Sequence, residues 1–365
     1  MKLSNAVLSL IFVSFVLAGC DAIEPSPSNA SLTDSDFVAD QLAKRPPVEP
    51  TAELLMSFDE QAGEAPEGVT VDRTGNIFVS IAPLGQLWKI APGATTPEPF
   101  GAIAGIDPSA GDLGLLGLTV DAQGNVYGGV QSSNPAANGV WVFDRKTGEA
   151  VRVEGSEAIA LANDVAFDKR GNLYITDSIL GAIWRLPKHG LLEPWLTGDE
   201  SLAGTGVLGL GAPIGANGIE FRQGILYVAN TEKGMIVAVP VGNDGLSGVT
   251  RVLAAFPEIE VAPGVLFPTA PDGLALDVFG NVYVAQINLS TVARVTPNGN
   301  VSVVFSGDPL DWPSSLAFGT SRNQQKTLFA VNFSIGESSG DTEQRMGPGL
   351  VAIRVGVPGM PLPGS

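Results

Sequence analysis

Four polar side chains recur at one position of a repeated segment in this 365-residue chain. Each lies five residues before the same position of the repeat, which in most copies is the Asp of an Asp-x-x-Gly-Asn segment. The four side chains are Glu67, Asn163, Asn217 and Asp272. They offer only oxygen ligands and two formal negative charges, a set that suits a hard cation such as Ca²⁺. Without a cation, carboxylates held close together at low dielectric would repel each other.

The segment that carries these residues occurs six times, at periods of about 40 to 50 residues, which is typical of propeller blades. The copies are PEGVTVDRTGNIFVS (66–80), LLGLTVDAQGNVYGG (115–129), ANDVAFDKRGNLYIT (162–176), ANGIEFRQGILYVAN (216–230), PDGLALDVFGNVYVA (271–285) and the weaker PSSLAFGTSRNQQKTLFAVN (313–332).

Each copy has the pattern of a β-hairpin. A short apolar strand leads to the turn, where a glycine such as Gly75 can take the left-handed conformation, and a second strand follows. Third strands and outer strands come next, so six copies of four strands predict an all-β, six-bladed β-propeller. Blade six lacks a fourth strand, and we expect residues 52–59 to pair with it and close the ring, which also hides sheet edges.

The propeller explains how residues far apart in sequence can form one site. The first strand of each blade lines the channel, so the six equivalent positions meet at one mouth. Glu67, Asn163, Asn217 and Asp272 are therefore predicted metal ligands, with Leu116 and Ser314 completing the ring. The alternative is that Asn-Gly and Asp-Gly pairs only shape turns.

The composition excludes several classes of function. The net charge of -18 would repel DNA and RNA, and no basic stripe with interleaved aromatics is present. One cysteine cannot form an intrachain disulfide, and with a single histidine it argues against a zinc site.

The N-terminus predicts export and a lipid anchor. Lys2 precedes an apolar stretch, 6–18, that is too short to span a bilayer comfortably, and Leu17-Ala18-Gly19-Cys20 looks like a bacterial lipobox. The alternative is an ordinary secretory signal. We therefore expect a lipoprotein signal peptide (1–20) with lipidation at Cys20, a flexible linker (21–50), the propeller (51–356) and a C-terminal tail (357–365). The expected location is the bacterial cell envelope, lipid-anchored to a membrane and periplasmic.

Over residues 51 to 356 the sequence resembles the gluconolactonase and regucalcin group of propellers, which is similar also to paraoxonases and strictosidine synthases. The family's ligand residues match Glu67 in Pro-Glu-Gly, the pair Asn163-Asp164, Asn217-Gly218 and Pro271-Asp272-Gly273. The resemblance implies a calcium-dependent hydrolase of lactones or related esters. The repeats also fit the NHL consensus, which is often non-catalytic, so a binding or scaffold propeller is the alternative.

The implied reaction begins with attack of water on the lactone carbonyl, whose developing charge the cation stabilises. Asp272 is the best candidate for the base, with Glu67 and Asp164 as lesser options, and activation of the water by the cation is an open alternative. Candidate substrate contacts are Asn163, Asp164, Asn230 and Trp312. Two apolar segments, 207–218 and 259–273, are expected to overhang the mouth as loops, which favours a hydrophobic lactone or ester.

Overall fold

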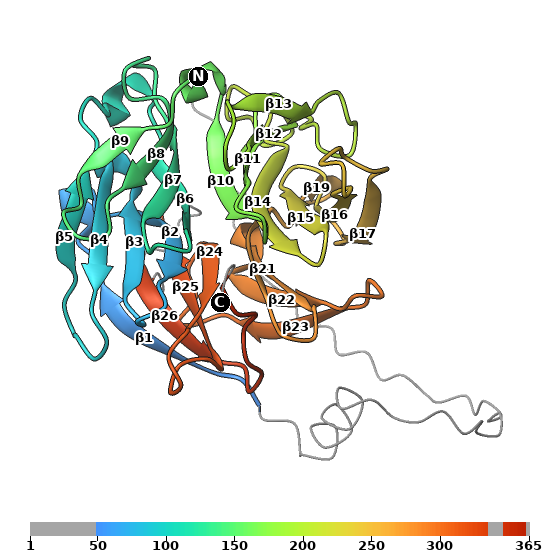
Figure 1. Ribbon diagram of the computed structural model, residues 1–365. Coiled ribbons are helices and arrows are strands. Elements are labelled where there is room, and N and C mark those ends of the chain that lie inside the picture. The colour runs from blue at the N-terminus through green and yellow to red at the C-terminus, as the bar shows by residue number, and fades with distance from the viewer. Residues whose placement is uncertain (1–48, 335–345, 363–365) are drawn as a thin grey trace, which may run out of the picture. The chain divides into compact units, whose positions relative to one another are not determined.

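The protein is a six-bladed β-propeller in which six four-stranded antiparallel sheets surround a channel (Figure 1). The computed structural model describes residues 49–334 and 346–362. The innermost strands of neighbouring blades contact each other around the whole circle, including blade 6 against blade 1. The predicted fold class is therefore confirmed. Cys20 and most of the predicted linker lie outside the described residues, so the predictions about them are untested.

The first three blades follow one another along the chain, each starting at the channel and ending at the rim. Blade 1 consists of β2 (Pro66–Val71), β3 (Ile77–Ile81), β4 (Gln86–Ile90) and β5 (Glu98–Ala102). Blade 2 consists of β6 (Gly114–Val120), β7 (Val126–Gln131), β8 (Gly139–Phe143) and β9 (Ala150–Arg152). Blade 3 consists of β10 (Ala162–Phe167), β11 (Leu173–Asp177), β12 (Ala182–Leu186) and β13 (Glu193–Leu196).

Blades 4 and 5 keep this order, and a separate hairpin lies between them in the sequence. Blade 4 consists of β14 (Ala216–Arg222), β15 (Ile225–Asn230), β16 (Met235–Pro240) and β17 (Arg251–Ala255). Blade 5 consists of β20 (Pro271–Leu276), β21 (Val282–Gln286), β22 (Thr291–Val295) and β23 (Val301–Ser306). The hairpin, β18 (Ile259–Ala262) and β19 (Val265–Phe267), occupies a segment that the sequence suggested was a loop. Short 3-10 turns are η1 (Glu60–Ala62), η2 (Ala82–Leu84), η3 (Pro108–Ala110), η4 (Ser156–Ala158) and η5 (Ile287–Leu289).

Blade 6 joins the two ends of the propeller. It consists of β24 (Pro313–Phe318), β25 (Thr327–Asn332), β26 (Gly349–Arg354) and the N-terminal β1 (Thr51–Ser57). β1 runs antiparallel to β26, with Thr51 opposite Arg354 and Ser57 opposite Gly349. The expected closure by an N-terminal strand is confirmed. Residues from Pro50 onward form one compact unit.

The Asp-x-x-Gly-Asn turns lock the first strand of a blade to the second. In blade 3, Asp168 Oδ1 accepts hydrogen bonds from the amides of Arg170 (2.8 Å) and Asn172 (2.9 Å), while Asn172 Nδ2 donates to Asp168 Oδ2 (2.7 Å). Gly171 supplies the left-handed residue, with φ 85°. Blades 1, 2 and 5 repeat this arrangement around Asp72, Asp121 and Asp277.

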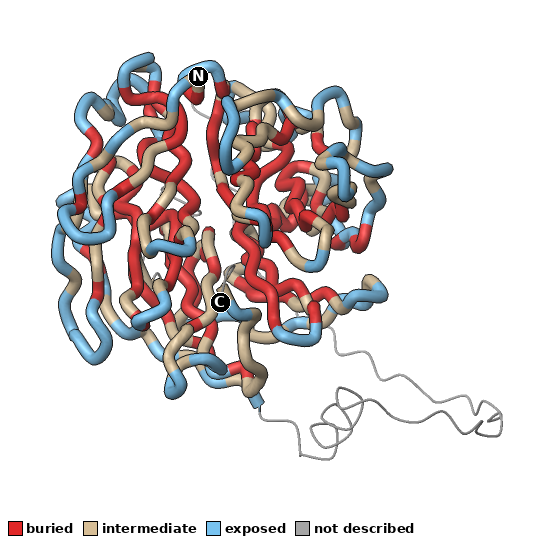
Figure 2. The backbone as a smooth tube through the Cα atoms, in the orientation of Figure 1, coloured by how far each residue is buried: buried red, intermediate tan, exposed pale blue. Residues whose placement is uncertain are grey.

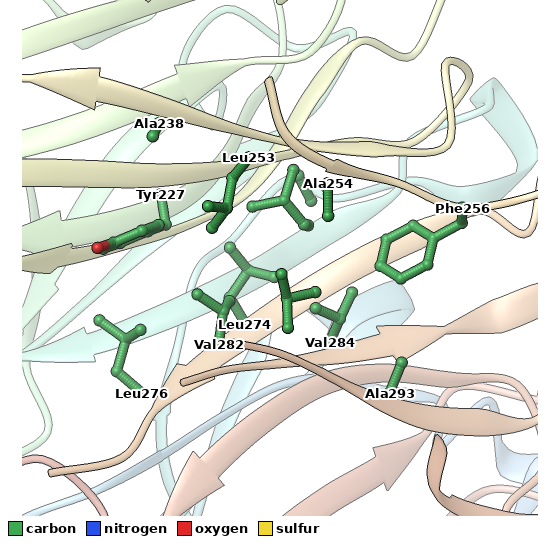
Figure 3. Packing of buried hydrophobic residues seen from close by; sticks show 13 residues of the cluster. Tyr227, Ala238, Leu253, Ala254, Phe256, Leu274, Leu276, Val282, Val284 and Ala293 are labelled. Carbon is green, nitrogen blue, oxygen red and sulfur yellow. The ribbon is translucent and has the colours of Figure 1, made fainter. Parts of the chain in front are cut away.

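The hydrophobic core lies between the blades. Inner strands are buried along their length, whereas rim strands are more exposed (Figure 2). Between blades 4 and 5, Tyr227, Ala238 and Leu253 of blade 4 pack with Leu274 and Val284 of blade 5 (Figure 3). Each such fully buried aliphatic side chain contributes about 1.5–3 kcal/mol relative to exposure. In the described part of the chain, no helix has the length and apolar character needed to cross a bilayer.

Candidate functional site

A β-bulge at the start of each innermost strand turns one side chain towards the channel axis. In blade 1, Pro66 pairs with Ile81 and Val69 pairs with Val79, so two residues, Glu67 and Gly68, oppose one. The same irregularity falls at Leu116, Asn163, Asn217 and Asp272, and a related shift falls at Ser314. Bulges redirect side chains next to functional sites. The Asn-Gly and Asp-Gly pairs therefore shape bulges within strands, not turns.

The second bulge residue is glycine in four blades because adjacent innermost strands approach closely there. A Cβ on Gly218 would come within 2.2 Å of the carbonyl oxygen of Asp272, and one on Gly68 within 2.4 Å of that of Leu116. Such distances are far below van der Waals contact. The glycines thus allow the six strands to converge tightly enough for their neighbouring side chains to share one site.

The four predicted ligands meet around one narrow cavity at the mouth of the channel. Glu67, Asn163, Asn217 and Asp272 all line it, together with Asp164 and Ser314. We call the four predicted ligands the polar ring. Glu67 and Asp272 are 7% and 5% exposed. The structure therefore brings together, from blades 1, 3, 4 and 5, the residues that the sequence pattern selected.

The ionised forms of the carboxyl groups in the polar ring are less stable than those of carboxyl groups in water. Burial, followed by the charges of Asp272 and Asp164, raises the pKa of Glu67 well above its usual range. Burial and then the charge of Asp164 raise the pKa of Asp272, which a hydrogen bond from the Asn217 side chain opposes. A bound cation would reverse the cost of ionising both groups, because it supplies the opposite charge that the site lacks.

Two hydroxyl groups fix the orientation of the amides in the polar ring. Asn217 Nδ2 donates to Thr231 Oγ1 (2.9 Å), and that hydroxyl donates its own proton to the carbonyl oxygen of Pro271 (2.9 Å). Because the Thr231 hydroxyl donates its single proton to Pro271, it can only accept a hydrogen bond from Asn217, so the Asn217 atom that faces it must be the amide nitrogen. Asn163 Nδ2 is held in the same way by Ser178 Oγ (3.0 Å), which donates to Ala216 (2.6 Å). The amide oxygens are left to face the cavity.

Two buried oxygens of the polar ring have no hydrogen-bond partner among the residues that the structure describes. These are Glu67 Oε2 and Asn217 Oδ1. Buried polar atoms are nearly always paired, and an unpaired one costs about 1–3 kcal/mol. Two orphaned acceptors from different blades, facing one cavity, fit a missing electropositive partner. Within residues 49–334 and 346–362, no three Asp, Glu, His or Cys side chains cluster as a metal site; the ring relies on amides instead.

Asp164 faces the polar ring but is already held by backbone amides. Its Oδ1 accepts from Val165 and its Oδ2 from Ile219, both at 2.9 Å, so it ties blade 3 to blade 4. Burial nevertheless raises its pKa to about 7, against the lowering effect of these bonds. Beyond it the channel continues as a cavity of about 80 Å³, lined also by Glu220 and, at the far end, by Met360.

The remaining predicted substrate contacts lie outside the lining of this cavity. Asn230 is fully buried, with Nδ2 donating to the carbonyls of Ser201 and Ala203 and Oδ1 accepting from Lys233. It anchors the loop that leads into β14. Trp312 is half-buried. Its backbone amide donates to Ser290 Oγ (3.2 Å), and its carbonyl oxygen accepts from the amide of Phe333 (3.1 Å). Their predicted contact with substrate stays a prediction.

A cluster of apolar residues, which we call the apolar rim, lies at the same end of the channel as the polar ring, and sequence reasoning did not select it. Buried Ala82, Leu116 and Leu161 form one cluster, against which Ile179, Ile214 and Phe333 pack half-buried. These residues come from loops and strand ends of five blades. Leu116 was recognisable as the apolar member of the repeat, whereas the others follow no repeat. Ser178 and Thr231 could have been recognised from the sequence, because each directly follows the end of the second strand of its blade.

Comparison with known proteins gives one family match. The SMP-30/gluconolactonase/LRE-like region matches residues 116–331, which include three of the four ring residues. A search of curated proteins found no match to the chain.

Solved structures share the fold at low sequence identity. Regucalcin from Agrobacterium tumefaciens, a calcium-binding protein, is 16% identical with TM-score 0.64, covering 86% of this chain and 96% of that one. A gluconolactonase from Xanthomonas campestris is 18% identical with TM-score 0.60, covering 85% and 90%. An auxiliary nutrient binding protein from Bacteroides ovatus is 11% identical with TM-score 0.60, covering 84% and 76%.

Proposed function

Because the chain belongs to the SMP-30/gluconolactonase/LRE-like family, we propose that it is a calcium-dependent hydrolase of lactones or related esters, tethered in the bacterial cell envelope. The observation that carries the proposal is the polar ring, with its orphaned Glu67 Oε2 and Asn217 Oδ1. A lactonase-type hydrolase agrees with the family. The cation, the substrate and the tether are the parts that experiments must test.

The ring residues fit a calcium ion. Glu67 and Asp272 supply the negative charge, and the amide oxygens of Asn163 and Asn217 supply neutral ligands, which together suit a hard cation. When bound there, the ion supplies Lewis-acid stabilisation for the charge that develops on a carbonyl oxygen.

The protein's own groups would bind the substrate and move the proton. We expect Asp272 to accept the proton of the attacking water, with Glu67 as the second candidate. Asp164 is the weaker candidate because both of its oxygens already accept backbone hydrogen bonds. Asn163 remains a candidate substrate contact, since its amide oxygen faces the cavity.

The surroundings of the ring favour an apolar substrate. The apolar rim lies at the same end of the channel as the polar ring. Val207 and Leu210 are exposed in the segment before β14, as are Val265 and Leu266 in the β18–β19 hairpin. A polar floor within apolar walls is the usual form of a small-molecule site. We therefore expect long-chain lactones to be hydrolysed faster than sugar lactones.

A lactone panel assayed with calcium and with a chelator tests the proposal. We expect hydrolysis that the chelator abolishes and calcium restores, and that Glu67→Gln and Asp272→Asn abolish with the fold intact. The nutrient-binding relative of the same fold supports the alternative, a non-catalytic NHL-like binding propeller. Calcium binding without hydrolysis of any lactone or ester would favour that alternative.

The tether has a separate test. Mass spectrometry of the membrane fraction should find a lipid-modified Cys20 as the first residue of the mature protein. A Cys20→Ala variant should then lose this modification. An unmodified protein cleaved at another position would leave the ordinary secretory signal as the explanation.

A further inference from the structure

The exposed cations of the propeller are distributed unevenly between its two faces. The strand directions define these faces: the site face carries the polar ring, and the opposite face carries the turns between first and second strands and those between third and fourth strands. Exposed cations gather on this opposite face. They are Arg73, Lys169, Arg170, Arg322 and Lys326 in the first set of turns, and Arg145, Lys146 and Lys188 in the second.

The site face is acidic. Within residues 49–334 and 346–362, its connecting segments contain one cation, Lys233, whose Nζ donates to the carbonyl of Glu200. Arg152, at the end of β9, also reaches this face and pairs with Glu157 (3.8 Å). The same segments carry many exposed carboxylates, among them Glu154, Glu157, Glu200, Glu258, Glu260 and Asp308. The exposed cations in the connecting segments therefore lie mainly at the end of the channel away from the polar ring.

The carboxylates of the opposite face are mostly engaged within their own turns. Asp72, Asp121, Asp168 and Asp277 each accept backbone amides and an asparagine side chain. Asp144 likewise accepts from the amides of Lys146 and Thr147. These carboxylates keep their negative charge, but Asp168 and Asp277 are buried, whereas the cations of the same face are exposed and more accessible to an approaching surface.

A groove between blades 2 and 3 brings three of these cations together. It has a volume of about 360 Å³, and its lining includes Lys169, Arg170 and Lys188 as well as Asp121 and Asp168. The aromatic side chains of Tyr127 and Phe167 also line it, with ring centroids 5.1 Å apart. Arg170 is held by the carbonyl and side-chain oxygens of Asn243 (3.1 and 3.2 Å). In the described part of the chain, no hydrogen bond or ion pair is recorded for the ammonium groups of Lys169 and Lys188.

The chain also enters the propeller from this face. β1 begins at Thr51, opposite Arg354 at the end of β26, and that end of blade 6 points away from the polar ring. A lipid on Cys20 would therefore be connected to the propeller through the opposite face.

We propose that the opposite face docks on anionic phospholipid headgroups, with the groove between blades 2 and 3 receiving a phosphate. The acidic site face is repelled by the same surface, so the mouth of the channel opens away from the membrane. This orientation presents the site to substrates in the aqueous phase. Docking depends on charge and is independent of whether the site is catalytic.

Vesicle co-sedimentation of residues 50–365, the compact unit, tests the proposal without a lipid anchor. We expect binding to vesicles of phosphatidylcholine mixed with phosphatidylglycerol, weaker binding at high salt, and no measurable binding to phosphatidylcholine alone. Lys169→Gln and Lys188→Gln should each weaken binding about fivefold, the effect of one cation near an anionic surface. Lys233→Gln is the matched control on the site face and should leave binding unchanged.

The orientation has its own measurement. The only cysteine precedes residue 50, so single cysteines can be labelled cleanly. A fluorophore at Ala122→Cys, in a turn of the opposite face, should be quenched by a lipid-borne quencher, whereas one at Ala110→Cys, on the site face, should not. The proposal is overturned if both vesicle types bind equally, if Lys233→Gln weakens binding as much, or if Ala110→Cys is the quenched position. Self-association dissolved by Lys169→Gln, without vesicle binding, would assign the face to a second copy instead.

Discussion

Replacing Thr231 by valine should weaken calcium binding although Thr231 is not a predicted ligand. The substitution keeps the shape of the side chain and removes the hydroxyl that fixes the Asn217 amide. Asn217 Oδ1 is then no longer held towards the polar ring. Partners that orient metal ligands typically contribute about 10–100-fold in affinity. We expect a loss in this range for calcium, with Glu67, Asn163 and Asp272 unchanged.

The same change should also cost stability without calcium. Asn217 Nδ2 and the carbonyl of Pro271 would both lose a buried partner, which costs about 1–3 kcal/mol for each unsatisfied group. Thr176→Val is the matched control. The Thr176 hydroxyl also donates to a carbonyl of the next innermost strand, that of Asn217 (2.7 Å), but it accepts from a backbone amide and orients no ring side chain.

Calorimetric titration with calcium, alongside chemical unfolding of the chelated proteins, separates the two effects. Both variants should unfold at lower denaturant concentration than the wild type, and only Thr231→Val should bind calcium more weakly. Equal affinities for the wild type and Thr231→Val would refute the reasoning that the hydroxyl orients a ligand. An equal loss of affinity in Thr176→Val would show that general loosening of the blades is the cause.

Three further predictions concern charge and closure. Glu67→Gln should stabilise the chelated protein at pH 8, because it removes a buried carboxyl group with a raised pKa, and it should abolish the stabilisation by calcium. Thermal unfolding with and without calcium measures both effects, and a chelated variant less stable than the chelated wild type would count against the prediction. Burial and the charge of Asp164 raise the pKa of Glu220 from 4.5 to about 8. The free energy of unfolding should therefore fall as pH rises from about 4.5 towards 8. Glu220→Gln should reduce this fall by at most about 5 kcal/mol, since the channel partly hydrates the Glu220 carboxyl group. Identical stability–pH profiles for the wild type and Glu220→Gln would show that Glu220 does not cause the fall. Deleting residues 1–57 should expose β26 and cause aggregation by light scattering, whereas deleting 1–48 should not.

The sequence predicted the ring because its signals are local and repeated. Strand alternation, turn glycines and the column of Asp-x-x-Gly-Asn segments fix the register of each innermost strand. Register determines which side chain faces the axis, so Glu67, Asn163, Asn217 and Asp272 could be selected without knowing any distance between them.

The parts that could not be predicted depend on contacts between blades. The bulges appear only when two strands are paired, so Asn-Gly and Asp-Gly had the signature of turns. The hydroxyls of Ser178 and Thr231 act on ligands of the same blade but donate to the next one. The apolar rim gathers Ile179, Ile214 and Phe333 from segments of different length, which no period reveals.

The closure of blade 6 has a consequence for biosynthesis. β1 is the first strand of the propeller to leave the ribosome, and β26, which separates it from β25, is the last. The circle of blades therefore stays open until all strands have been synthesised. Its closure must join the two segments of the propeller that lie farthest apart in the sequence. Contacts of that kind form slowly, so we expect the pairing of β1 with Gly349–Arg354 to be a late step of folding.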